Sequence, residues 1–165
     1  MSNRNVLAAV GVMLAMTGAS QVLPSAQQKP TVRLTPQDYT EIQELLARYN
    51  STLNVGDAEG FASIFLPDGS LNIPNNEGVM VRTTGYDALV EFVRPKPLDQ
   101  VRFTPNLIVR STPEGATASS DQFAWRIDKG AVTFIGGFDD VLVKTREGWR
   151  FKTRTIHRGP AKPAS

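Results

Sequence analysis

The stretch ATASSDQFAWRIDKGAVTFIGGFDDVLVKTREGWRFKTRTIH, residues 116–157, decides the fold. Much of it alternates between apolar and polar side chains with the period of two that is typical of β-strands, and the turn sequences Asp128-Lys129-Gly130 and Arg146-Glu147-Gly148 interrupt it. The predicted strands cover residues 116–127, 131–145 and 149–157. With a preceding strand over 101–110, they predict an antiparallel meander.

The chain before this region has the spacing of helices. Thr35-Pro36-Gln37-Asp38 predicts a helix start, apolar residues then recur at helical spacing, and Gly56 predicts the helix end. Helices followed by a long antiparallel sheet indicate an α+β fold. If the sheet is strongly curved, it can wrap the helices and leave a cavity between them. Gly136-Gly137 predicts a bend or bulge in that sheet. The smaller predicted elements are a helix after Asp57, strands over 70–73 and 79–83, and a helix after Gly85.

Composition narrows the classes of function. The 165 residues, with 41% hydrophobic and 21% charged side chains, are those of one ordinary globular domain. The absence of cysteine excludes disulfides and thiol nucleophiles, and a single histidine excludes a multi-histidine metal site. We therefore expect no metal and no cofactor.

Basic residues are concentrated near the end of the chain, although the net charge is only +2. This bias would suit an anionic ligand or a nucleic acid. Arg150, Lys152 and Arg154 alternate along a strand, however, which is typical of a solvated face. No nucleic-acid-binding motif accompanies them, so we expect no nucleic-acid partner.

The N-terminus has the layout of a secretory signal peptide. Arg4 precedes the apolar run VLAAVGVMLAM, and the small residues Ala19, Ser20 and Ala26 each allow cleavage. The run is too short to cross a membrane, and no later stretch is long and apolar enough to do so. We therefore expect an exported protein, periplasmic or secreted. The expected divisions are a signal peptide over 1–26, a linker over 27–34, the domain over 35–158 and a disordered tail over 159–165.

Several motifs carry a family resemblance. They are EIQELLARY from Glu41, the pair Gly56-Asp57, the segment VRFTPN from Val101, the segment GFDD from Gly137, and GWRF from Gly148 with Arg154. In their order and spacing, residues from about 38 to 154 resemble the SnoaL-like branch of the nuclear transport factor 2-like superfamily. The resemblance implies a cone-shaped α+β fold with one pocket. The superfamily contains dehydratases, cyclases, isomerases and binding domains, so the fold alone fixes no reaction.

The resemblance also implies where chemistry would lie. In dehydratase-like members a tyrosine and an aspartate of the first helix work with histidines of the sheet. Tyr49 matches the tyrosine, Asn54 stands in place of the aspartate, and Arg102, or Phe103 with a shift of one residue, stands in place of a histidine. Tyr49 would donate a hydrogen bond to an oxyanion, or serve only as a core aromatic residue. Arg102 would hold an anion or polarise a carbonyl group but cannot act as a base.

Other candidates come from the predicted strands. Asp121 shares its parity with Phe123 and Trp125, so it is either an inward general base or a solvated acid. His157 shares its parity with Trp149 and Phe151 and is either an inward proton carrier or part of a fraying end. The remaining ligand-contact candidates are Asn54, Phe65, Asn106, Phe123, Trp125 and Asp140. Asp140 is alternatively a structural partner of a cation such as Arg154.

Three functions remain open at this stage. The first is a cofactor-free lyase or isomerase acting on a small hydrophobic carbonyl compound, with Tyr49 and Arg102 stabilising negative charge while Asp121 or His157 moves the proton. The second is a binding protein for a small apolar molecule, which the altered positions Asn54 and Arg102 favour. The third is an interaction module that forms a homodimer through the outer face of its sheet.

The predicted signal peptide leads to a prediction about the N-terminus of the exported protein. We expect the exported chain to begin after Ala19, Ser20 or Ala26, because a signal peptidase removes the segment once it has directed export. The intact mass of protein recovered from the exported fraction would measure this loss. A full-length chain in that fraction would contradict the prediction.

Overall fold

The computed structural model describes residues 33–159. The predicted signal peptide over 1–26, most of the linker and the tail beyond residue 159 lie outside these residues. In chain order the helices are α1 (Pro36–Val55), α2 (Ala58–Ser63) and α3 (Tyr86–Val93). The strands are β1 (Phe65–Pro74), β2 (Met80–Thr84), β3 (Gln100–Phe103), β4 (Ile108–Thr112), β5 (Gly115–Arg126), β6 (Ala131–Thr145) and β7 (Gly148–Arg158).

Helix α1 begins and ends where the sequence predicts. Thr35 and Asp38 form a reciprocal capping box, and Gly56 ends the helix with a left-handed φ of 74°. The buried carboxylate of Asp38 also accepts hydrogen bonds from Lys144 Nζ at 2.6 Å and from Trp149 Nε1 at 3.0 Å. These contacts tie the start of α1 to the ends of β6 and β7.

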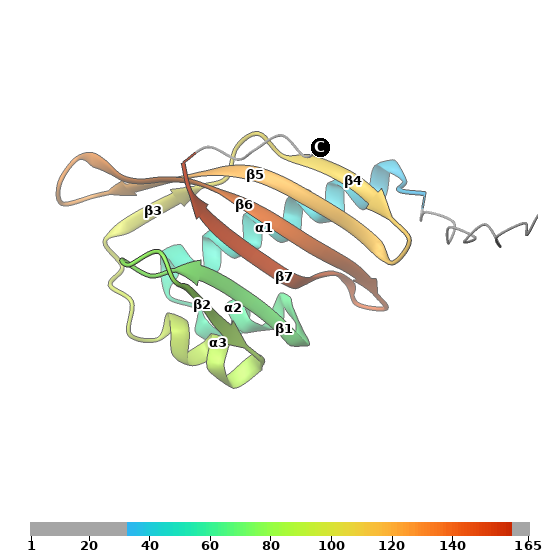
Figure 1. Ribbon diagram of the computed structural model, residues 1–165, viewed down its shortest axis with the longest axis horizontal. Helices are drawn as coiled ribbons and strands as arrows, with labels where there is room; N and C mark the ends of the chain where they lie inside the picture. Colours follow the sequence, from blue (N-terminus) through green and yellow to red (C-terminus); the bar gives the residue numbers. More distant parts are fainter. Residues whose placement is uncertain (1–32, 160–165) are drawn as a thin grey trace, which may run out of the picture.

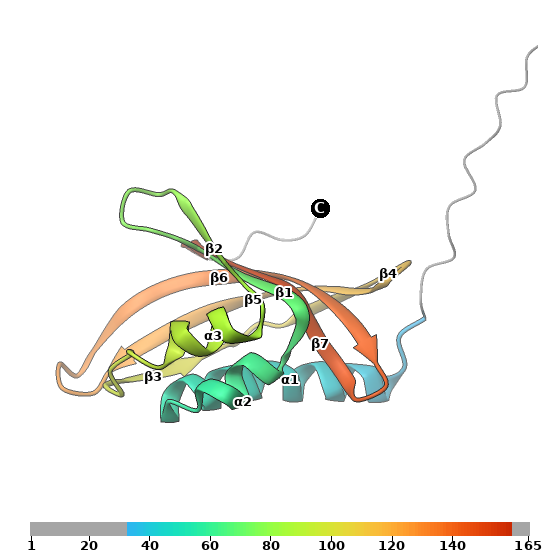
Figure 2. The same ribbon diagram turned by 90° about the horizontal axis from the view of Figure 1, so that it is seen from below.

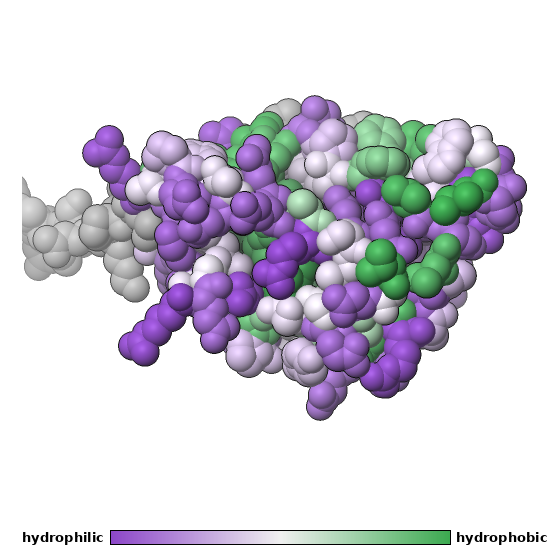
Figure 3. Space-filling view, turned by 180° about the vertical axis from the view of Figure 1, so that it is seen from behind, coloured by the Kyte–Doolittle hydropathy of each residue, from purple (hydrophilic) through white to green (hydrophobic). Residues whose placement is uncertain are grey.

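The strands form one seven-stranded sheet with the order β2-β1-β7-β6-β5-β3, in which β4 also pairs with β5. The sheet is curved and not closed, and it arches over the helices, with α1 crossing its concave side (Figure 1, Figure 2). The helix-bearing side of the molecule is mainly hydrophilic, and its hydrophobic side chains gather at the end opposite the grey N-terminal trace (Figure 3). No helix within residues 33–159 has the length and apolar character needed to span a bilayer.

Two details differ from the predicted meander. β1 is longer than expected and pairs in parallel with β7, with an irregularity between Phe65 and Ser70. The strand expected over residues 101–110 is split into β3 and β4, because Asn106 adopts a left-handed φ of 58° directly after Pro105. This break lets β5 pair with β3 along one part of its edge and with β4 along another.

The bulges of the sheet do not lie at Gly136-Gly137. Of the two register shifts among β5, β6 and β7, one follows Ala124 on β5, and the other lies opposite Val141 and Leu142, where Lys152 is the extra residue on β7. An extra residue reverses the faces to which later side chains point. Trp149 and Phe151 are therefore buried before the bulge, while Arg154 and Ile156 are buried after it. The alternation of Arg150, Lys152 and Arg154 predicts that all three lie on a solvated face. Arg154 is buried instead, because the bulge at Lys152 reverses the direction of its side chain.

Arg154 lies at the centre of the core with its side chain fully buried. Its guanidinium carbon lies 3.5 Å from the ring centroid of Phe138, 4.0 Å from that of Tyr49 and 4.7 Å from that of Phe151. Asp140, the residue opposite it on β6, is also fully buried, and Arg154 Nη1 lies 3.5 Å from Asp140 Oδ2. Neither side chain forms a hydrogen bond within residues 33–159, so the pair is held by charge and by the aromatic rings.

Burial raises the pKa of Asp140 to about 7, although the neighbouring Arg154 opposes that rise. We expect Asp140→Leu to lower the free energy of unfolding by about 3–5 kcal/mol, because it leaves the charge of Arg154 buried without its partner. Arg154→Met should cost less, because the buried Asp140 carboxyl group then takes up a proton. The double variant should lose less stability than either single variant, since it leaves an apolar pair. Chemical denaturation of the four proteins measures this, and additive losses would contradict it.

Candidate functional site

A cavity of about 310 Å³ lies between the concave side of the sheet and the helices. Its walls are mainly apolar, and its polar groups come from five different segments, so the fold rather than any local motif assembles it. The lining residues are Tyr49, Leu53, Ile73, Phe92, Lys96, Gln100, Arg102, Gln122, Ala124, Thr133, Phe134 and Ile156.

The structure brings two of the predicted catalytic residues together in this cavity, Tyr49 from α1 and Arg102 from β3. Burial raises the pKa of Tyr49 to about 12, against the opposing effect of Arg154 and Arg102, so the phenol remains a hydrogen-bond donor at neutral pH. Arg102 Nη2 donates a hydrogen bond to Gln100 Oε1 at 3.2 Å. Both groups would therefore face an oxygen of a bound molecule as donors.

Phe123 and Trp125 do not line the cavity. They share a parity, as predicted, but that parity faces outward, and 41% of Trp125 is exposed. The inward residues of β5 are small or polar, among them Gln122 and Ala124. The aromatic residues of β5 therefore do not mark its inner face. The cavity forms beside this strand because the inward side chains are small.

Asp121 also faces outward with Phe123, away from the cavity. Its carboxylate Oδ2 accepts a hydrogen bond from Asn106 Nδ2 at 2.7 Å, and its backbone N–H donates to the carbonyl of Pro105. Asn106 is likewise absent from the cavity wall. The pair instead fixes the break between β3 and β4 against β5.

His157 points to the outer side of the sheet as well, because the bulge at Lys152 reverses its parity relative to Phe151. Its Nε2 lies 3.5 Å from Oδ2 of Asp139, an exposed residue of β6. Two predicted proton carriers, Asp121 and His157, are therefore separated from Tyr49 by the sheet itself.

The other candidates have structural contacts. Asn54 Oδ1 accepts a hydrogen bond from the backbone N–H of Arg102 at 3.0 Å, which ties the end of α1 to β3. Phe65 is buried against Phe61 and Phe151, outside the cavity. Asp140 pairs with Arg154, as its structural interpretation predicts.

Sequence reasoning missed Lys96, Gln100 and Gln122 as cavity residues. Lys96 lies in the segment after α3 that the two neighbouring prolines interrupt, and nothing in its local pattern points to a site. For Gln122 the signal was present, because it lies on the opposite parity from its aromatic neighbours. A polar residue among small residues on a strand would have identified the inner face.

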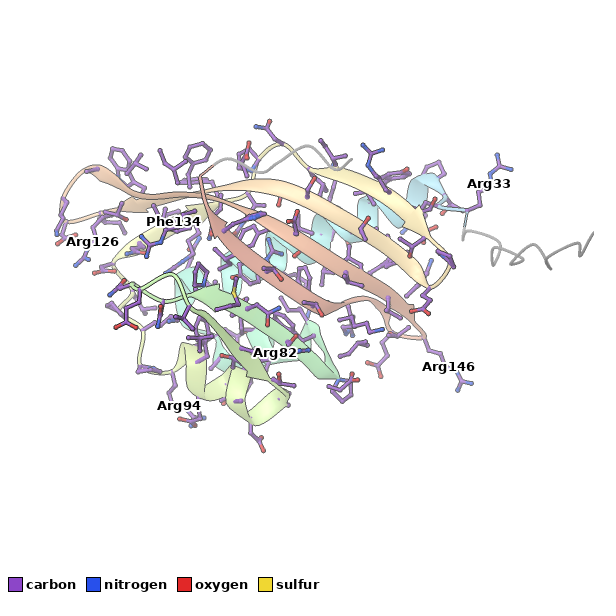
Figure 4. The ribbon with its side chains drawn as sticks, viewed as in Figure 1. Arg33, Arg82, Arg94, Arg126, Phe134 and Arg146 are labelled. Carbon is purple, nitrogen blue, oxygen red and sulfur yellow. The ribbon has the colours of Figure 1, made fainter. Side chains whose placement is uncertain are left out.

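Gly136 shapes one wall of the cavity. A methyl group at this position would lie 2.3 Å from a ring carbon of Phe134 and 2.5 Å from the carbonyl oxygen of His157. The missing side chain therefore makes room for the Phe134 ring, which lines the cavity near the β5–β6 end of the molecule (Figure 4). Gly136 serves close packing here rather than the bulge that the sequence predicts.

The arrangement combines hydrogen-bond donors and cations with apolar walls. Within residues 33–159, no carboxylate or histidine lines the cavity, and no group of three or more potential metal-ligating side chains occurs. The lining residues can therefore hold and polarise an oxygen of a ligand. The cavity lacks the acid–base pair that the resemblance implies for a dehydratase.

Comparison with known proteins supports the fold. Residues 35–155 match the SnoaL-like domain family. No match was found among curated proteins.

Three solved structures are similar. A nuclear transport factor 2-like protein with a cystatin-like fold from Novosphingobium aromaticivorans is 22% identical, with a TM-score of 0.67 over 74% of this chain and 82% of that one. A candidate scytalone dehydratase from the same species is 18% identical, with a TM-score of 0.63 over 78% and 89%. A protein of unknown function from Mycobacterium tuberculosis is 27% identical, with a TM-score of 0.64 over 74% and 76%.

Proposed function

The chain belongs to the SnoaL-like domain family, and we propose that it binds a small, mainly apolar molecule in the cavity between its sheet and helices. The observation that carries the proposal is the combination of apolar walls with Tyr49 and Arg102 as donors in one hollow. A cavity of about 310 Å³ has the size of pockets that hold small organic ligands. An oxygen of the ligand would face the two donors.

A lyase or isomerase acting on a small carbonyl compound is the second candidate. The neutral phenol of Tyr49 beside the Arg102 guanidinium favours it, because such donors stabilise an oxyanion. One structural neighbour is described as a candidate scytalone dehydratase, which is a further reason to test for turnover. The outward placement of Asp121 and His157 favours binding over turnover.

We expect 2-acetonaphthone, a neutral aromatic ketone, to bind the purified protein in isothermal titration calorimetry. Ala124→Phe should abolish this binding by filling the cavity, and Tyr49→Phe should weaken it about three- to tenfold by removing one hydrogen bond. Recovery of the ketone unchanged would favour a binding protein, whereas a chemically altered product would favour the enzyme.

Ala47→Phe is the matched control, because Ala47 is exposed on α1 and the same substitution there adds the same bulk away from the cavity. Thermal unfolding of each variant verifies that it is folded. Equal binding by the wild type and Ala124→Phe would rule out this cavity as the ligand site.

We propose further that the protein is a homodimer through the outer face of its sheet. Phe103, Trp125 and Ile135 are exposed there, and Phe103 and Ile135 pair across the sheet with the same residue, Phe123. Light scattering coupled to size-exclusion chromatography should give twice the monomer mass for the wild type and the monomer mass for Trp125→Lys/Ile135→Lys. A monomeric wild type at tens of micromolar would contradict this proposal.

A further inference from the structure

Two cations line the cavity without a carboxylate among its lining residues. They are Lys96, from the segment after α3, and Arg102, from β3. Neither forms an ion pair within residues 33–159. Asp99 acts on Arg102 electrostatically, but its carboxylate is already 2.6 Å from Arg126 Nη2.

Lys96 is held in place by its surroundings. Its backbone N–H donates a hydrogen bond to the carbonyl of Val93 at 2.9 Å, and the adjacent Pro95 and Pro97 restrict the chain on both sides. Its ammonium lies 3.8 Å from the ring centroid of Phe92, another lining residue. The charge is therefore positioned at the cavity rather than free in solvent.

Arg102 is fixed from two sides. Its backbone N–H bonds to Asn54, and its strand pairs with β5 opposite Ala124, which places its side chain on the cavity side. One hydrogen bond to Gln100 occupies Nη2, and a guanidinium has five N–H donors, so donors remain for a ligand.

The two cations also repel each other. Burial lowers the pKa of Lys96, and the charge of Arg102 lowers it further. Two like charges in a partly desolvated cavity are stabilised by an anion between them, which also forms charge-assisted hydrogen bonds. The apolar side chains of Leu53, Ile73 and Ile156 around them favour an organic ion over an inorganic one.

We propose that Lys96 and Arg102 form the anion-recognising end of the cavity, and that the ligand is a small aromatic or alicyclic carboxylate. This inference rests on the proposed binding function and names its ligand class. The carboxylate would lie between the ammonium and the guanidinium, and the hydrocarbon part would contact the apolar walls.

The test compares two probes of nearly the same shape, 2-naphthoate and the neutral 2-naphthamide, by isothermal titration calorimetry at pH 7. We expect the wild type to bind the carboxylate about tenfold or more tightly than the amide, as expected for charge-assisted hydrogen bonds. Lys96→Met should weaken carboxylate binding about tenfold and change amide binding less than about threefold. Arg102→Met also removes a donor to a neutral oxygen, so it should weaken binding of both probes and that of the carboxylate more.

Arg146→Met is the matched control, since it removes the same charge at the end of the molecule opposite Phe134 (Figure 4). Lys96 is only half-buried and lies outside the strands, so its variant should fold even if Arg102→Met does not. Equal affinity for both probes, or equal loss in Arg146→Met and Lys96→Met, overturns the inference while leaving the proposed function in place. Binding of neither naphthoate, naphthamide nor 2-acetonaphthone overturns both.

Discussion

The buried guanidinium of Arg154 is the contact on which the rest of the structure depends. It joins three elements, because the rings around it come from α1, β6 and β7. A charge in this position needs its counter-charge, and Asp140 lies directly opposite on the neighbouring strand. A slip of one residue between β6 and β7 would bring either Asp139 or Val141 opposite Arg154, so the pair specifies the register of the central strands.

Much of the fold could be predicted from the sequence because the capping and turn residues lie where the helices and strands of the structure begin and end. Thr35 and Asp38 begin α1, Gly56 ends it, and the turn at 128–130 joins β5 to β6 as expected. Pro105 and Asn106, by contrast, divide a predicted strand in two. Periodicity was therefore a reliable guide wherever turn residues stood at its ends, and it failed where an unusual backbone conformation lay within a run.

The site was harder to predict because a bulge carries almost no sequence signal. One extra residue, Lys152, turns Arg154 inward and His157 outward, so the parity of Phe151 does not extend to the end of β7. On β5 the alternation is right, but the aromatic side is the outer one. Tyr49 and Arg102 were found through the resemblance, whereas Lys96 reaches the cavity only through the tertiary fold.

The chemistry of the cavity follows from these placements. Asn54, for which the resemblance implies an aspartate in dehydratase-like proteins, uses its side-chain oxygen to anchor the backbone of Arg102. This side chain thus supports the strand that carries a cation of the cavity. The resulting cavity presents positive charge and a neutral phenol, an environment suited to holding an oxygen rather than to moving a proton.

The contact between Gly136 and Phe134 restricts how the size of this cavity can change among homologues. The ring stays against the strand only because position 136 has no side chain, so the dimensions of the hollow are set at a residue that does not line it. A homologue with alanine there would have to move the ring or replace it with a smaller group. Among homologues, the size of ligand that the cavity accepts would then depend on positions 134 and 136 together. A comparison of lining residues alone would include Phe134 but omit Gly136.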